Sequence, residues 1–416
     1  MKFEQLVKGG LAAVMTLSLA ACGNGSSSNA NAGTSATADS GTATAAADSG
    51  SAAGAAAFKL GLSGPLTGGA SVYGQAVKNA VEIAVEEINE KGEVKFDFTM
   101  EDDEHDAEKA VNAYNALKDW GVQISLCTVT SAPGAAVAPL YQEDSTFALT
   151  PSGSSLAVIY ADSDNMANAY GNVFQMCFTD PNQGVASADY LSAHTDLGTK
   201  VAVIYKNDDN YSTGIYNKFV SEAAEKKLEV VYEGTFAGED NDFNVQLSKA
   251  QEAGADILFL PIYYQPASTI LKQANDMGYK PTVFGVDGMD GILSMEGFDI
   301  KLAEGVYLLT PFSADASDDL TKNFVAKYQE KFGETPNQFA ADTYDCVYAI
   351  AQALKNAGST PDMSNADLCS ALVGQFTSMT FNGLTGNDVT WNANGEVSKA
   401  PKAVVIKDGV YVGAEG

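Results

Sequence analysis

Two serine-rich loops are the first segments of this sequence that can bind a small molecule. Ser131 stands at the start of an expected helix, and Gly153, Ser154 and Ser155 follow an expected strand. A serine hydroxyl and the free amides of a helix N-terminus bind anions together. Since none of the 24 basic residues is an arginine, hydroxyls, amides or a lysine would have to hold a carboxylate here. Each loop alone also fits an ordinary cap or turn, but the two together favour a carboxylate pocket.

One acidic loop residue and three tyrosines complement the positive and apolar parts of a ligand. Asp287 follows an expected strand, and its carboxylate can hold an ammonium group, although an Asx turn beside Gly288 explains it equally well. Tyr73, Tyr211 and Tyr263 stand in strand-end loops, where aromatic rings can close over an apolar side chain. Tyrosine is also common in exposed loops, so the rings alone do not decide the ligand.

Signals for catalysis and for metal binding are weak. The chain has two histidines, His105 and His194, and contains neither a G-x-S-x-G nor an H-E-x-x-H pattern. The glycine-rich segment 64–69 lacks the Lys-Ser/Thr pair of a phosphate-binding loop. The acidic run 101–106 lacks the EF-hand spacing and is expected to cap the helix that begins near Ala107. We therefore expect a protein that is not an enzyme and that uses no metal and no cofactor.

The loops belong to two runs of alternating strands and helices. Strands separated by helices of about 10–15 residues indicate parallel sheets with helices on both faces. Ligands of such sheets bind beyond the carboxyl ends of the strands, where the candidate residues lie. The sequence predicts an α/β fold of two doubly wound parallel-sheet lobes. The expected strands are 59–63, 96–100, 122–127, 146–149, 200–205, 228–232, 256–260, 282–285, 389–391, 403–406 and 410–412, and the expected helices lie around 77–88, 110–117, 133–143, 213–226, 243–253, 267–277, 320–332 and 339–357.

The first 57 residues carry an export signal and a linker. Residues 1–21 combine two lysines with an apolar run of about 11 residues, which is shorter than the roughly 20 that span a bilayer. Leu19-Ala-Ala-Cys22 resembles the bacterial lipobox, whose cysteine is acylated. Residues 22–57 are otherwise almost all small or polar, which predicts a flexible tether. We expect lipidated Cys22 to anchor an extracytoplasmic protein to the cell membrane; plain secretion is the alternative.

Composition narrows the possible partners. A formal net charge of −29 at pH 7 excludes nucleic acid as a partner and argues against docking on anionic lipid through a basic face. The cysteines after Cys22 are even in number, but their spacing matches no metal site, so two disulfides and buried free thiols both remain open. These residues are Cys127, Cys177, Cys346 and Cys369.

An ordered set of short motifs runs from residue 58 to the end of the chain. The motifs are Gly64-Pro-Leu-Thr-Gly68 with Tyr73-Gly74, Glu101-Asp-Asp103, Ser131 with Ala138-Pro-Leu-Tyr141, Thr150-Pro-Ser-Gly-Ser154, Asp208-Asp-Asn-Tyr211, Tyr263-Tyr264 and Phe284-Gly-Val-Asp287-Gly288. In this order they resemble a type I periplasmic binding protein, of the branched-chain amino-acid (Leu/Ile/Val) receptor family of ABC importers. The lipobox is similar to that of Gram-positive members, which tether the receptor to the membrane.

The resemblance implies a role for each candidate residue. Ser131 and Ser154, with the amides of residues 152–155, would hold an α-carboxylate, and the Gly153 carbonyl would share the α-ammonium with Asp287. The side-chain pocket would be walled by Tyr73, Tyr211 and Tyr263. Receptors of this family tend to have glutamate at the position of Asp287. Aspartate is one methylene shorter, which leaves the ligand class unchanged but the particular amino acid open.

The resemblance also implies how the chain divides. Three crossings would join the lobes, near residues 179–181, 310–311 and 384–386. Lobe 1 would comprise residues 58–180 and 312–383, and lobe 2 residues 181–311 and 384–416. Closure of the lobes would bring the carboxylate loops to Asp287, because a ligand that contacts both lobes favours the closed state.

The expected function is that of a monomeric, lipid-anchored receptor that captures an amino acid, most simply a branched-chain or aliphatic one, and delivers it to an ABC permease. One alternative is a sensory module with the same fold. Another is a receptor for an amide, urea or a carboxylic acid without an amine. Asp287 distinguishes these ligands, since a buried carboxylate without a cationic partner is costly.

Overall fold

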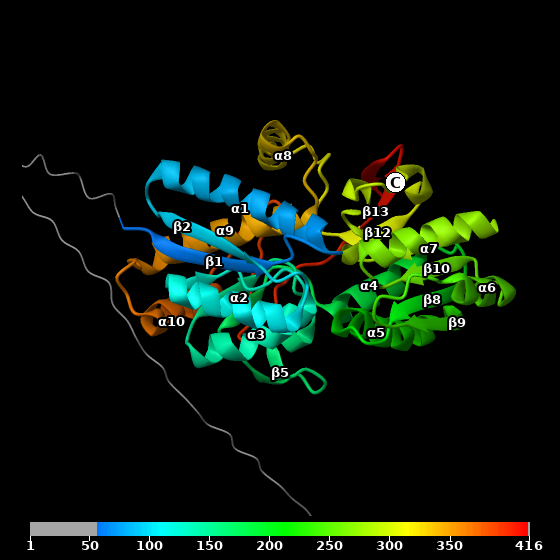
Figure 1. Cartoon of the computed structure of the whole chain (residues 1–416), viewed down its shortest axis with the longest axis horizontal. Helices are drawn as coiled ribbons and strands as arrows, with labels where there is room; N and C mark the ends of the chain where they lie inside the picture. Colours follow the sequence, from blue (N-terminus) through cyan, green and yellow to red (C-terminus); the bar gives the residue numbers. More distant parts are fainter. Residues whose placement is uncertain (1–55, 415–416) are drawn as a thin grey trace, which may run out of the picture. The chain divides into compact units, whose positions relative to one another are not determined.

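The N-terminal sheet is all parallel and has five strands in the order β2-β1-β3-β4-β7. The structure is a computed structural model that describes residues 56–414 (Figure 1). The expectations for the signal peptide, Cys22 and most of the linker lie outside these residues. The strands are β1 (Phe58–Gly64), β2 (Phe96–Asp102), β3 (Ile124–Ser125), β4 (Phe147–Thr150) and β7 (Val173–Gln175).

The C-terminal sheet repeats this strand order and adds an antiparallel edge. Its seven strands run β14-β13-β12-β11-β10-β8-β9, and the part from β12 to β9 is parallel. The sequence predicts the last two strands, β13 and β14. It does not predict that they pair antiparallel with the sheet. The strands are β8 (Lys200–Lys206), β9 (Glu229–Phe236), β10 (Ile257–Leu260), β11 (Thr282–Gly285), β12 (Tyr307–Thr310), β13 (Lys402–Lys407) and β14 (Val410–Gly413).

Helices cover both faces of each sheet, as Figure 1 shows for α1 and α2 on the N-terminal sheet. Along β4, Phe147 and Leu149 pack in the core with α1 and α9, whereas Ala148 packs in the core with α2 and α3. This alternation is the two-residue period of a strand buried on both faces. The helices are α1 (Ser71–Lys91), α2 (Ala107–Trp120), α3 (Ser131–Glu143), α4 (Asp180–Ala193), α5 (Asn210–Lys226), α6 (Asn244–Glu252), α7 (Tyr264–Met277), α8 (Asp319–Phe332), α9 (Gln338–Ala357) and α10 (Asn365–Phe376).

The two predicted ends of α2 show why such boundaries can be read from sequence. The Asp106 side chain accepts the amide of Lys109 over 2.9 Å, as a helix N-cap does. Gly121 ends the helix with a φ of 91°, a conformation that favours glycine. The fold class expected from the alternation is confirmed by the two sheets.

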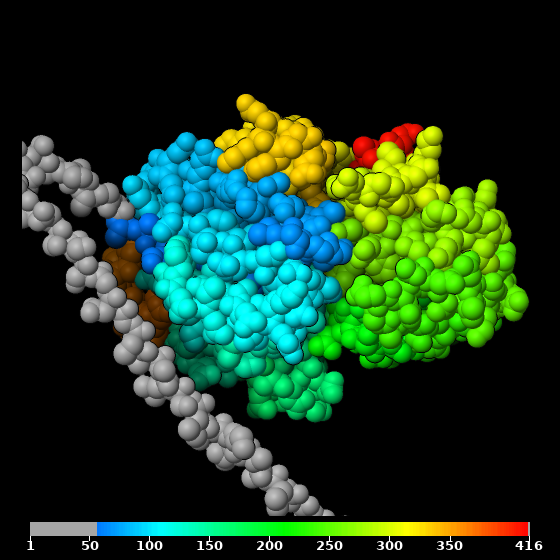
Figure 2. Space-filling model, viewed as in Figure 1, coloured from blue at the N-terminus to red at the C-terminus, as the bar shows by residue number. Residues whose placement is uncertain are grey.

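A small hairpin was not expected from sequence. It consists of β5 (Tyr160–Asp162) and β6 (Ala167–Ala169), and it projects from the N-terminal lobe (Figures 1 and 2). Its Met166 is 61% exposed. We use "lobe" below for each large sheet with the helices that pack on it.

The third connection between the lobes differs from the expectation. The Trp391 indole donates to the Gln175 carbonyl over 2.8 Å and packs on Phe376 with a ring-centroid distance of 4.7 Å. This buried contact keeps Trp391 on the N-terminal lobe. The predicted crossing near residues 384–386, and with it the start of lobe 2 at 384, is therefore wrong. The chain reaches the C-terminal sheet only at β13.

A buried ion pair lies next to this connection. Lys399 Nζ is 2.7 Å from Asp342 Oδ1 and donates to Thr385 Oγ1 over 2.6 Å. Thr385 in turn donates to Asp345 over 2.6 Å. Buried charges need such paired, hydrogen-bonded surroundings. The described cysteines are free and buried, which answers the question of disulfides that the sequence left open.

Candidate functional site

The two serine loops lie together at the carboxyl ends of β3 and β4. The amide of Ser155 donates to Ser131 Oγ over 3.2 Å, and Ser152 Oγ donates to the Val129 carbonyl over 2.6 Å. The loop is tightened by Thr150, whose hydroxyl accepts the amide of Gly153 over 2.8 Å. Parallel strands put their following loops at one sheet edge, so segments more than 20 residues apart in sequence become neighbours.

Ser154 is the loop residue with an unused hydroxyl. Its side chain is fully buried, and within residues 56–414 its Oγ has no hydrogen-bond partner. The neighbouring Gly153 carbonyl accepts a bond from Gln175 Nε2 over 2.7 Å and keeps a second lone pair. Buried polar groups are normally satisfied, so an unpaired hydroxyl beside free acceptor capacity marks a place for a polar ligand group.

The three tyrosines expected to wall a pocket are in contact with one another. The rings of Tyr211 and Tyr263 stack at 4.5 Å with an interplanar angle of 10°, and Tyr73 meets Tyr263 edge-on at 5.8 Å. Tyr73 belongs to the N-terminal lobe, whereas Tyr211 and Tyr263 belong to the C-terminal lobe. The Tyr73 hydroxyl donates to the Gly288 carbonyl, which ties the lobes together across the aromatic cluster.

Asp287 contacts this cluster through Tyr211 and is 3% exposed. Its Oδ1 accepts a hydrogen bond from the Tyr211 hydroxyl over 2.6 Å, and its amide donates to Gln183 Oε1 over 3.2 Å. Burial raises the pKa of Asp287 to about 7, while the hydrogen bond from Tyr211 acts in the opposite direction. A carboxyl group poised in this way gains from a cation brought next to it.

One acidic residue beside the site was missed by sequence reasoning. Asp180, the first residue of α4, is 1% exposed, and neither of its carboxyl oxygens has a hydrogen-bond partner within the described chain. Burial, with repulsion from Asp287 and Asp209, raises the pKa of Asp180 well above its ordinary value, while the nearby Ser154 hydroxyl acts in the opposite direction. In sequence, Asp-Pro at 180–181 looks like a plain helix start. The signal was hidden because the strand before it, β7, has only three residues.

His105 also lies near the site, but in a supporting position. Its ring meets Tyr263 edge-on at 5.3 Å, and its Nδ1 is 2.9 Å from Thr130 Oγ1. Burial lowers the pKa of His105, which favours the neutral ring. Within residues 56–414 no group of three or more His, Cys, Asp or Glu side chains is arranged to hold a metal ion.

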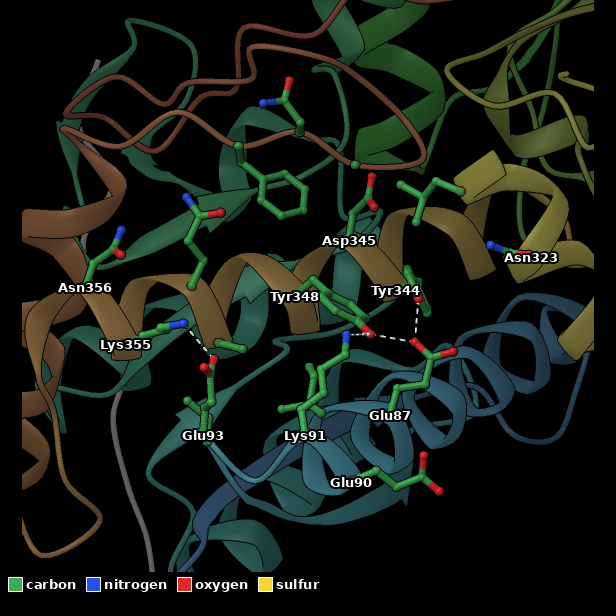
Figure 3. A pocket seen from close by; sticks show the side chains of 18 of the residues that line it. Glu87, Glu90, Lys91, Glu93, Asn323, Tyr344, Asp345, Tyr348, Lys355 and Asn356 are labelled. Atoms are coloured by element: carbon green, nitrogen blue, oxygen red, sulfur yellow. Dashed lines mark hydrogen bonds and ion pairs between the residues drawn. The ribbon is translucent and has the colours of Figure 1, made fainter. Parts of the chain in front are cut away.

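A hollow of about 1040 Å³ lies elsewhere, in a groove along α1, α8 and α9. Figure 3 shows Lys355 facing Glu93, and Glu87 facing Tyr344 and Tyr348, across the groove. Lys355 pairs with Glu93 over 2.6 Å, and Glu87 accepts a hydrogen bond from Tyr344 over 2.6 Å. Because these groups satisfy each other, the groove presents no buried, unpaired group to a ligand. The strand-end loops are the stronger candidate site.

Comparison with known proteins shows the family of this chain. The sequence profile of the family described as "Periplasmic binding protein" matches residues 57–409. The chain belongs to this family. The family consists of substrate-binding receptors and not of enzymes, as the sequence led us to expect. Among the described residues, every helix is too short or too polar to cross a bilayer.

Curated relatives and solved structures support the same fold. The chain is 26% identical over 309 residues to Leu/Ile/Val-binding protein homolog 1 of Brucella abortus, covering 72% of this chain and 78% of the relative. It is 24% identical over 308 residues to a leucine-, isoleucine-, valine-, threonine- and alanine-binding protein of Pseudomonas aeruginosa, covering 73% and 79%. Its structure is similar to a leucine binding protein of Thermotoga maritima, with 26% identity, a TM-score of 0.74, and coverage of 86% and 97%.

A further solved structure shows that this fold accepts unlike ligands. A solute binding protein of an ABC transporter from R. palustris, in complex with benzoate, is similar to this chain with 20% identity and a TM-score of 0.75, covering 86% and 96%. At that identity the likeness shows the fold alone. The ligand of this chain must therefore be argued from its own side chains.

Proposed function

We propose that this protein is an extracytoplasmic receptor of an ABC importer, anchored by a lipid at Cys22, that captures a zwitterionic amino acid between its lobes. The observation that carries the proposal is the placement of complementary groups. Neutral hydroxyls and amides belong to the N-terminal lobe, and the buried carboxyl of Asp287 belongs to the C-terminal lobe. The hydroxyls and amides suit the carboxylate of an α-amino acid, and the carboxyl suits its ammonium group.

The anionic pole is assigned to the serine loops. Ser131 and Ser154 offer hydroxyls. The amides of Ser152, Gly153 and Ser155 donate to Thr150 and Ser131 within the loops, so the Ser154 amide is the one of residues 152–155 left for a carboxylate. Neutral dipoles suit a carboxylate here because a chain without arginine has no guanidinium fork. Their fixed positions at the ends of buried strands reduce the ordering cost of binding.

The cationic pole is assigned to Asp287 with the Gly153 carbonyl. An ammonium group would stabilise the ionised carboxylate, which burial penalises. Tyr73, Tyr211 and Tyr263 would then enclose the side chain of the ligand. Their apolar rings favour a branched-chain or aliphatic side chain, the ligand class that the names of the curated relatives also state.

A receptor for an amide, urea or an amine-free acid is the alternative, and the benzoate complex makes it concrete. An anionic ligand without an ammonium group would leave Asp287 buried without a counter-ion. The residues therefore favour an amino acid. Delivery to a permease, as opposed to a signalling partner, rests on the kinship with transport receptors.

Calorimetric titration of the mature chain from residue 23 against the twenty amino acids, urea and benzoate tests the ligand class. We expect saturable binding of one or more aliphatic amino acids, and none of benzoate or urea. Binding of benzoate in place of every amino acid would refute the proposal. For the anchor, cells fed labelled palmitate should incorporate it into the wild-type protein and not into Cys22→Ala.

A further inference from the structure

A second cavity, of about 490 Å³, lies between the lobes beside the serine loops. Its N-terminal wall is formed by residues around Ser155 and Ser163, and its C-terminal wall by the first turns of α4 and α5, including Asn210, Thr213 and Asn217. Most of these side chains are polar. Within the described chain, Tyr73, Tyr211 and Tyr263 are not among its lining residues, so it is distinct from the aromatic cluster.

Asp180 is one of the residues that line this cavity, and its buried carboxyl oxygens have no hydrogen-bond partner within the described chain. Space for the carboxyl depends on Gly214 of α5, since a Cβ at that position would lie 3.1 Å from both Cβ and Oδ2 of Asp180. A buried carboxyl without a hydrogen-bond donor is costly, and none of the described side chains compensates it fully. The cavity next to it is the place from which a donor can come.

The charged side chains around the cavity favour a positively charged ligand group. Asp164 is exposed at the rim, and Asp180 lies within the wall. One lysine, Lys218, also lines the rim, but its Nζ lies 3.7 Å from Glu222 Oε2, so its charge is partly balanced. An anion in this cavity would meet Asp180, whereas an ammonium group would find the carboxyl, serine and threonine hydroxyls and asparagine carbonyls as acceptors.

We propose that this cavity is a subsite for a second ammonium group of the ligand, with Asp180 as its counter-ion. The inference rests on the proposed function and extends its substrate class to amino acids with an amine at the end of the side chain, such as lysine and ornithine. Ser155 lines the cavity and also belongs to the carboxylate loop, so the cavity adjoins the proposed amino-acid site. Asp287 would keep the α-ammonium, and Asp180 would take the distal one.

Titration calorimetry of the mature chain with lysine, ornithine and norleucine tests this subsite, since norleucine has the length of the lysine side chain without its amine. Wild type should bind both diamino acids. Asp180→Asn should weaken lysine binding at least tenfold and change norleucine binding less than threefold. The matched control is Asp189→Asn, which removes the same charge from an exposed position of the same helix and should change neither.

Gly214→Ala provides a second test that keeps the carboxyl. Its new Cβ would crowd Asp180, so lysine binding should weaken while norleucine binding persists. Cadaverine, which carries two amines and no carboxylate, should bind at least tenfold more weakly than lysine. Equal binding of cadaverine and lysine would overturn the assignment to a side-chain amine. Binding of leucine without lysine or ornithine would overturn the subsite and leave the proposed function intact, whereas no binding of any amino acid would overturn the proposed function.

Discussion

The Tyr211 hydroxyl donates a hydrogen bond of 2.6 Å to Asp287 Oδ1 and accepts one of 2.9 Å from the amide of Gly288. The tyrosine thus fixes both the carboxyl and the backbone beside it. It also helps to keep the carboxyl ionisable in a buried position, because a donated hydrogen bond stabilises the charged form. This relationship sets the pH range in which the proposed ammonium site can work.

Ligand affinity should depend on the ionisation of Asp287. Burial raises its pKa to about 7, so the carboxyl is increasingly protonated as the pH falls below that value. Since only the ionised form attracts an ammonium group, affinity should fall with decreasing pH by up to about tenfold per unit. Titration calorimetry between pH 5 and 9 measures this. Asp287→Asn should bind weakly at every pH, and a wild-type profile in this variant would contradict the assignment.

Removal of the Tyr211 hydroxyl should move this profile. In Tyr211→Phe the carboxyl of Asp287 loses a hydrogen bond that lowers its pKa, so the pKa should rise. We expect affinity to fall at pH 7 and to approach that of wild type at pH 9. The comparison variant is Tyr216→Phe, whose hydroxyl bonds Glu233 on the surface. An unshifted midpoint in Tyr211→Phe would show that this contact does not tune the site.

Contacts to the carboxylate and to the ammonium group of the ligand should contribute comparably to the binding free energy. Ser131→Ala and Asp287→Ala should each weaken amino-acid binding by about 1.5–3 kcal/mol, the range for hydrogen bonds to charged groups. Ser378→Ala, at an exposed position after α10, is the control and should bind as wild type does. Calorimetry on all three variants decides the point. Unchanged affinity in both site variants would refute the site.

Closure of the lobes should depend on Tyr73. Its hydroxyl donates to the Gly288 carbonyl and accepts the amide of Tyr264 over 3.3 Å, so Tyr73→Phe loses two contacts to the C-terminal lobe. Affinity should fall by about 1–2 kcal/mol. X-ray scattering with saturating ligand should show a larger radius of gyration than wild type. Tyr348→Phe makes the same change in the distant groove, and an equal effect there would exclude a specific role for Tyr73.

The buried pair beside the third connection should be needed for stability. Lys399→Met leaves Asp342 buried without its cation and should lower the free energy of unfolding by about 3–5 kcal/mol. The double variant Lys399→Met with Asp342→Leu should recover most of this loss, since both charges are then gone. Urea denaturation measures both. Lys355→Met breaks an exposed pair and should leave the midpoint unchanged.

Much of the fold could be predicted from local sequence patterns. Helix ends such as Asp106 and Gly121 follow from capping chemistry, and buried strands such as β4 follow from unbroken apolar runs. Two kinds of feature could not be predicted: very short elements, and residues whose position depends on contacts with residues far away in the sequence. The three-residue β7 gives too little pattern, and the position of Trp391 is decided by its contact with Phe376, which lies in another element.

The candidate site, too, was determined partly by the sequence and partly by the tertiary structure. The sequence by itself determined that hydroxyls, amides, an acid and tyrosines follow the strands, because strand ends and turn residues are local features that parallel sheets gather at one edge. Only the tertiary structure decided that Asp180 is buried without a partner, because that depends on α4 packing against α5 at Gly214, and desolvation is a property of packed neighbours and not of sequence spacing.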